Sequence, residues 1–268
     1  MLQSLDKKVL FSGLVLAVAL LILASAFKNG KPTCNRFIFN TYAYVAFMTV
    51  WVVACSLYLI DYVKTNKSSA ANQSNTPESS KTSKSAMLLL SPLNLVILFF
   101  FSLYLLYRTM VLPAYKPLQK HIMALLWLTT FSVFLIPLTE RIQRTNPDAL
   151  AQLTTIFFSI IGSATAVAVL LPSLIKSWWI FPLMIGLFGV IVARLIFGII
   201  GLPMSSPEQK GLSYFVIILF TFFVSYDTRV AMQASKICRE GQADYILFST
   251  NLFLDFINIF SNLFNVSD

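Results

Sequence analysis

The stretch "NLFLDFINIF", Asn251 to Phe260, reads as membrane helix apart from its polar positions, and one of these is a carboxylate, Asp255. The surrounding apolar run extends from 244 to 264, and about 20 such residues span a bilayer core as a helix. A charged side chain at mid-bilayer costs about 2.5 kcal/mol or more. We therefore expect Asp255 to face other helices or a wet cavity, where its charge can be solvated.

The whole chain has the composition of a polytopic membrane protein. Its 268 residues are 57% hydrophobic and 12% charged, with a mean hydropathy of +0.76, which is too apolar for a soluble domain. No long alternating strand pattern occurs. We predict an all-α polytopic membrane helix bundle. Its apolar segments are 9–27, 37–63, 88–107, 121–139, 149–172, 179–201, 212–232 and 244–264.

The formal net charge of +9 does not indicate nucleic-acid binding, because Lys and Arg are scattered through short loops and form no basic face. They are typical of membrane-flanking charge. If segment 37–63 starts in the cytosol, ten Lys and Arg are cytosolic and nine are opposite, counting Lys7 and Lys8 with the nine. Four of the nine lie in a polar loop rather than beside a helix, so this orientation is our expectation.

The chain divides into an N-terminal apolar segment and flank, 1–36, and a transmembrane domain, 37–268. Segment 9–27 ends in a sequence that resembles a signal-peptide cleavage site, but it is long enough to span, and we expect an uncleaved helix or signal anchor. The Ser, Asn, Thr and Lys content of 64–86 predicts a disordered loop. Its sequons at Asn66 and Asn72 matter only if the loop faces a lumen.

The three cysteines, Cys34, Cys55 and Cys238, are an odd number and show no C-x-x-C spacing. This pattern indicates neither a zinc site nor a disulfide framework. We expect three free, buried thiols.

The last segment carries a polar stripe. Asn251, Asp255, Asn258 and Asn262 follow one another at steps of four, three and four residues, which confines them to a helix face about 60° wide. Lipid cannot satisfy these groups. A structural hydrogen-bond seam between helices explains the asparagines, whereas the carboxylate favours a functional role.

A second intramembrane carboxylate, Asp227, is placed to meet Asp255. The sequence between them has no proline and a single glycine, Gly241, where a helix can end and the chain reverse. Fourteen residues separate Gly241 from each aspartate. An antiparallel helical hairpin would put both at the same height, about 21 Å from the turn.

Two contacting carboxyl groups away from water should titrate as a coupled unit. When both are ionised they need a cation, either a protein Arg or a hard ion such as Ca²⁺. Protonation removes that need. The pair therefore has the chemistry of a pH-gated cation pathway.

Three other ionisable residues are less informative. Arg108 ends segment 88–107 and either flanks the membrane or reaches the aspartates. Arg194 lies deeper and needs a buried acceptor, for which Asp61 or Glu140 serves as well as the pair. The only histidine, His121, is most simply an interfacial residue.

These residues resemble the signature of a known family. The ending "SYDTRV…DYILFSTNLFLDFINIFSNL" closely resembles the C-terminus of Bax inhibitor (transmembrane Bax inhibitor motif) proteins, a "YDT"-like helix followed by "NLYLDIINLFL". Asp227 and Asp255 fall on the two signature aspartates. Upstream, "FIFNTYAYVAFMTVWVVA" resembles the first family helix, whereas segment 9–27 has no counterpart.

The resemblance implies seven transmembrane helices, here with one extra N-terminal apolar helix, and a central last helix. It implies a paired-aspartate pH sensor, Asp227 and Asp255, with Arg108 at the place of a latch. It further implies a proton-sensitive Ca²⁺ leak from internal stores such as the endoplasmic reticulum, and restraint of cell death. Ca²⁺ is then a transported ion held by the aspartates rather than a resident cofactor.

Two alternatives from other classes stay open. A non-transporting scaffold would bind membrane-bound cell-death regulators through the polar stripe. An intramembrane aspartyl protease would use the same two aspartates as general acid and base, but "NLFL" precedes Asp255 where that class carries Gly-x-Gly-Asp, and no Pro-Ala-Leu segment is present. We therefore expect no enzyme. The expected partners are the lipid bilayer, protons and Ca²⁺.

Overall fold

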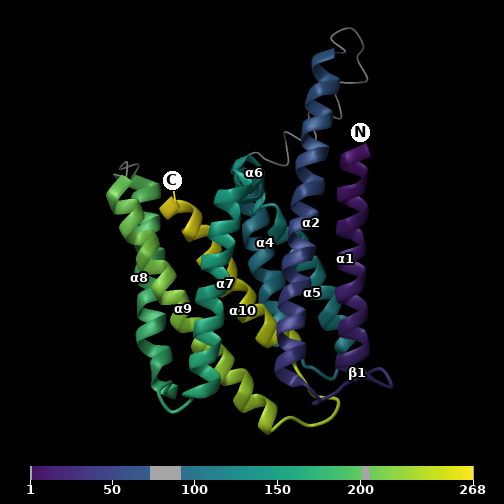
Figure 1. The fold of residues 1–268 in the computed structure, drawn as a ribbon, viewed down its shortest axis with the longest axis vertical. Coiled ribbons are helices and arrows are strands. Elements are labelled where there is room, and N and C mark those ends of the chain that lie inside the picture. Colours follow the sequence, from purple (N-terminus) through teal and green to yellow (C-terminus); the bar gives the residue numbers. More distant parts are fainter. Residues whose placement is uncertain (1, 73–91, 201–205, 268) are drawn as a thin grey trace.

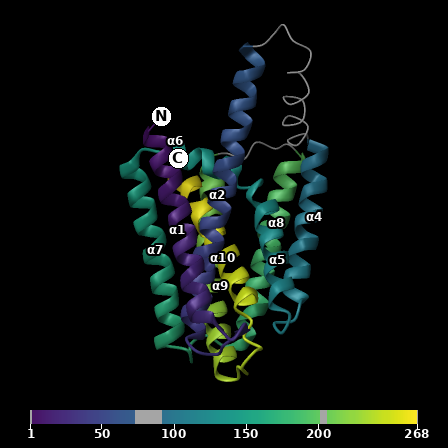
Figure 2. The same cartoon turned by 90° about the vertical axis from the view of Figure 1, so that its right-hand side faces the viewer.

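The computed structural model describes residues 2–72, 92–200 and 206–267, and it confirms the all-α bundle (Figures 1 and 2). The long helices run roughly along one common direction. The helices are α1 (Leu2–Ala26), α2 (Phe37–Asn72), α4 (Pro92–Val111), α5 (Pro117–Ser132), α6 (Ile136–Arg144), α7 (Pro147–Leu170), α8 (Ile180–Ile200), α9 (Ser206–Lys236) and α10 (Tyr245–Ser267), with a 3₁₀ turn, η1 (Ser177–Trp179).

Within the described residues, six helices are long and apolar enough to cross a membrane: α2, α4, α7, α8, α9 and α10. The predicted single span 121–139 is instead broken into α5 and α6, which are bent by 59°. Pro137 lies in the first turn of α6, where its missing backbone N–H and the clash of its ring with the carbonyl of Val133 prevent α5 from continuing through it. Counted as one bent span, the pair makes a seventh.

The N-terminal helix α1 lies beside α2 in both views. Its described apolar part, Gly13–Ala26, is shorter than a span. Two short antiparallel strands, β1 (Phe27–Lys28) and β2 (Lys31–Pro32), follow it. Asn29 and Gly30 turn between the strands with φ of 52° and 73°, the left-handed conformation of a two-residue hairpin.

Helix α2 continues to Asn72, past the start of the loop expected from 64 to 86. Residues 64–72, including both sequon asparagines, are therefore helical and not part of a disordered loop. The rest of that predicted loop lies outside the described residues.

The last helix, α10, is central, as the resemblance implied. It contacts α2, α4, α5, α7 and α9, and half of its span is buried, against 11% for the span of α8. Trp127, Phe131 and Phe253 form one part of this core, where Phe253 packs edge-on against both α5 rings. Both chain ends lie at the end of the bundle opposite β1 and the α9–α10 connection (Figure 1).

Candidate functional site: a buried aspartate pair

The structure brings Asp227 and Asp255 together. Helix α9 ends at Lys236, the chain reverses through Gly241 at a φ of 80°, and α10 returns from Tyr245. The two carboxyl groups contact each other at hydrogen-bonding range. The equal spacing on both sides of Gly241 predicted this meeting, and the geometry confirms it.

The two carboxyl groups have different surroundings. Asp255 is 5% exposed, whereas Asp227 is half-buried. Ionised carboxylates only accept hydrogen bonds, so a hydrogen bond between the two requires a shared proton. Asp255 Oδ2 is buried and has no hydrogen-bond donor among the described residues. The pair therefore has an oxygen available for a proton or a cation.

A polar bridge from α2 lies next to the pair. The Tyr42 hydroxyl lies 2.8 Å from Thr165 Oγ1 of α7 and 2.8 Å from Thr228 Oγ1 of α9. Thr228 directly follows Asp227, and the Tyr42 ring lies 6.3 Å from the Phe256 ring, which directly follows Asp255. Tyr42 thus joins the three helices around the pair, and no local pattern in the sequence marked it.

The asparagines of the polar stripe mostly bond within their own helix. Asn258 Nδ2 donates to Leu254 O at 2.8 Å, and Asn262 Nδ2 donates to Asn258 O at 2.7 Å. Asn251 is half-buried on the same helix. The stripe is therefore not a continuous seam of bonds between helices.

Arg194 finds its acceptor on this stripe. Its Nη2 donates to Asn262 Oδ1 at 2.9 Å, so α8 is tied to α10. The acceptor is thus neither Asp61 nor Glu140, which the sequence offered as alternatives. An acid is the partner that charge alone predicts for an intramembrane arginine, whereas the acceptor here is a neutral amide oxygen.

Arg108, the expected latch, is exposed at the end of α4. Within the described part of the chain it makes no hydrogen bond or ion pair with Asp227 or Asp255. In this conformation the pair is held by its own contact.

A second buried polar group was missed by sequence reasoning. Lys120 is 2% exposed, and its Nζ donates to Asp244 Oδ2 at 2.6 Å and to Leu112 O at 2.7 Å. Asp244 Oδ1 accepts from the backbone N–H of Leu247, so the same carboxylate caps the start of α10. Lys120 is one of the ten Lys and Arg residues that the sequence assigns to the membrane flank on the side where segment 37–63 starts, whereas in the structure it ties α5 to α10.

His121 belongs to this buried end rather than to a simple interface. Its Nδ1 lies 2.6 Å from Pro117 O and its Nε2 lies 2.7 Å from the Tyr44 hydroxyl. Because a carbonyl only accepts, Nδ1 carries a hydrogen. The Phe27 ring also contacts the imidazole.

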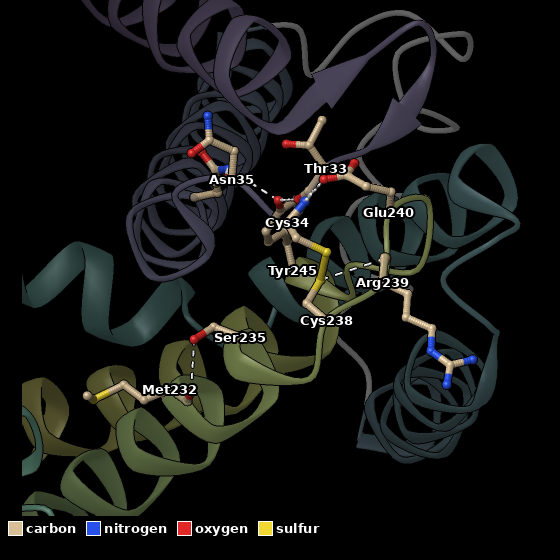
Figure 3. The surroundings of a disulfide bond; sticks show 10 residues. Thr33, Cys34, Asn35, Met232, Ser235, Cys238, Arg239, Glu240 and Tyr245 are labelled. Atoms are coloured by element: carbon tan, nitrogen blue, oxygen red, sulfur yellow. Dashed lines mark hydrogen bonds between the residues drawn. A yellow bond between two sulfur atoms is a disulfide. The ribbon is translucent and has the colours of Figure 1, made fainter.

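Two of the three cysteines form a disulfide, which corrects the expectation of free thiols (Figure 3). Cys34 and Cys238 have Cα atoms 5.8 Å apart although 204 residues separate them. Cys55 is free. The spacing rules for cysteines concern local motifs, so they carry no information about a pair brought together by the ends of α2 and α9.

The chain matches the model of a known protein family. The model of the family described as "Inhibitor of apoptosis-promoting Bax1" matches residues 34–266. The matched range begins after β2 and contains both aspartates. No curated protein and no solved structure matches the chain.

Proposed function

The chain belongs to the Bax inhibitor family of integral, multi-pass membrane proteins, and from this premise and the buried aspartate pair we propose that it is a pH-sensitive Ca²⁺ leak channel. Its place is an internal membrane such as the endoplasmic reticulum. There it regulates Ca²⁺ stores and, through them, cell death. The observation that carries the proposal is the contact between Asp227 and Asp255.

The charge of the pair depends on its protons. With one shared proton the two carboxyl groups hold each other, and α9 and α10 stay together at this height. With no proton, two negative charges in contact repel each other unless a cation lies between them. With both protonated, the attraction for a cation is gone, so acidification weakens Ca²⁺ binding at the pair.

The two carboxylates offer few ligands to a Ca²⁺ ion, which favours its passage over tight binding. Ca²⁺ prefers six to eight oxygen ligands, and among the described residues no group of three or more acidic, His or Cys side chains gathers to hold a metal ion. Two carboxylates supplemented by water give a site that an ion can enter and leave, which conduction requires.

The decisive experiment is Ca²⁺ flux into proteoliposomes as a function of pH. Asp227→Asn and Asp255→Asn keep the size of the side chain but remove its titration, so both should lose the pH dependence. Asp148→Asn, the same change at an exposed site in the first turn of α7, is the matched control and should behave like the unsubstituted protein. An unchanged pH profile in both pair variants would rule out the proposal.

The alternatives predict different results. A scaffold that binds cell-death regulators through the polar stripe needs that stripe to be accessible, yet Asn262 is fully buried and Asp255 nearly so. An intramembrane aspartyl protease would use the same carboxyl contact and would bind a transition-state inhibitor. We propose transport without catalysis, and such binding would contradict it.

A further inference from the structure

A cleft of about 270 Å³ lies between the α7–α8 connection and the end of α9, and neither Asp227 nor Asp255 lines it. Arg229, Gln233 and Lys236 are spaced four and three residues apart, so they share one face of α9. The lining contains two cationic side chains and no acidic one. It consists of Pro172, Ser173, Arg229, Met232, Gln233 and Lys236.

The polar side chains of this cleft have no hydrogen-bond partner in the described part of the chain. Arg229 Nη1 is buried and has no hydrogen-bond acceptor among the described residues. Within the same residues, the side chains of Lys236, Gln233 and Ser173 make no hydrogen bond or ion pair either. A buried donor without an acceptor costs about 1–3 kcal/mol, and more when it is charged. The cleft therefore has positive charge that no described side chain neutralises, and an anion would bind there favourably.

The surroundings place the cleft at the boundary between lipid and water. Trp178 is 58% exposed, and its neighbour Trp179 packs edge-on against Phe222 of α9 at 5.7 Å. Tryptophan is enriched at the level of the lipid headgroups. Phe222 lies seven residues before Arg229, about 10 Å further along the helix, and is exposed like Leu170 and Leu174. Apolar surface for acyl chains thus adjoins a cationic cleft.

We propose that this cleft binds the phosphate group of a membrane phospholipid. The planar guanidinium of Arg229 matches two phosphate oxygens, and Lys236 adds a second positive charge. Ser173 and Gln233 supply further donors from the rim. The proposal does not depend on Ca²⁺ transport, and it gives the buried Arg229 nitrogen an acceptor that the described residues do not provide.

Native mass spectrometry of the full chain, released from nanodiscs that contain phosphatidylglycerol and phosphatidylcholine, tests the site. The unsubstituted protein should retain phosphatidylglycerol, and Arg229→Gln should weaken this binding about tenfold, as expected for loss of one charge-assisted contact. Arg229→Lys should retain part of it. Arg239→Gln is the matched control. It removes one positive charge, as Arg229→Gln does, but Arg239 is exposed in the adjacent connection and does not line the cleft.

Inorganic phosphate carries the same chemical group as a phospholipid headgroup. A second measurement distinguishes these two ligands. Inorganic phosphate alone, added to lipid-free protein in detergent, should not raise the melting temperature. If it does so in the unsubstituted protein but not in Arg229→Gln, the lipid assignment is wrong and the ligand is a soluble phosphate. Equal lipid retention by Arg229→Gln and Arg239→Gln, with equal melting temperatures, would overturn the site altogether.

Discussion

Cys34 and Cys238 form a disulfide that fastens the α9–α10 connection to the start of α2. Backbone and side-chain bonds reinforce it: Gly241 N donates to Pro32 O at 2.8 Å, and Cys34 N donates to Glu240 Oε1 at 3.2 Å. Figure 3 shows Tyr245 beside the same segment, where its hydroxyl donates to Thr33 O. The hairpin that carries both aspartates is thus held at its turn.

Removing this disulfide should destabilise the protein. Cys34→Ser or Cys238→Ser releases a loop of about 200 residues in the unfolded chain, and losses of about 2–5 kcal/mol are typical for a native disulfide. Denaturant unfolding in detergent measures the change. Cys55→Ser, at the free cysteine, is the control. Equal stability of all three variants would show that the bond contributes nothing.

The same disulfide predicts the orientation of the chain. Disulfides persist in oxidising compartments, so the end of the bundle with Cys34 and Cys238 should face a lumen or the exterior. The span Phe37–Lys64 separates this end from Asn66 and Asn72, which should therefore stay unglycosylated. This is the reverse of the orientation expected from the near-even count of Lys and Arg on the two sides of the membrane. Lys120, which is part of that count, is neutralised by Asp244 and contributes little to the charge bias.

Glycosidase treatment and thiol labelling of intact membranes check this orientation. The protein should show no mobility shift with glycosidase, and Cys34 and Cys238 should react with maleimide only after reduction. A glycan on Asn66, or labelling of Cys34 without a reductant, would restore the orientation expected from sequence.

Replacing one partner of the Lys120–Asp244 ion pair should lower the free energy of unfolding more than replacing both partners. Asp244→Asn keeps an oxygen to cap α10 but leaves the 2%-exposed Lys120 ammonium without its counter-ion, which costs about 3–5 kcal/mol in buried pairs. In Lys120→Met with Asp244→Asn the uncompensated charge is gone. A double-mutant cycle on the free energy of unfolding should therefore be strongly non-additive. Additive losses would mean that the pair is not coupled.

The aspartate pair should make stability depend on pH. The folded pair holds a shared proton that two separate, solvated carboxyl groups would release, so the folded state binds more protons at neutral pH and stability falls as pH rises. Asp255→Asn removes the repulsion between two ionised carboxylates and should flatten this dependence. Thermal unfolding in Ca²⁺-free buffer from acid to alkaline pH measures it, with Asp148→Asn as the control. If the stability of Asp255→Asn fell with rising pH as steeply as that of the unsubstituted protein, the shared proton would be contradicted.

The fold class and the meeting of the two aspartates can both be predicted from the order of the residues. Apolar runs of spanning length leave few alternatives to a helix bundle, since every backbone polar group must be satisfied within the membrane. The height of Asp227 and Asp255 follows from the constant rise of a helix and from one glycine that adopts a φ of 80°. Both are local properties, so counting residues is enough to predict them.

The partners that come from distant segments are seen only once the chain is folded. Cys34 meets Cys238, Arg194 finds Asn262, Lys120 is buried against Asp244, and Arg229 keeps a buried nitrogen beside an open cleft. No short-range spacing in the sequence indicates any of these contacts. They depend on the order and the tilt with which helices pack, which arise from the sum of many weak contacts and not from any single stretch of the chain.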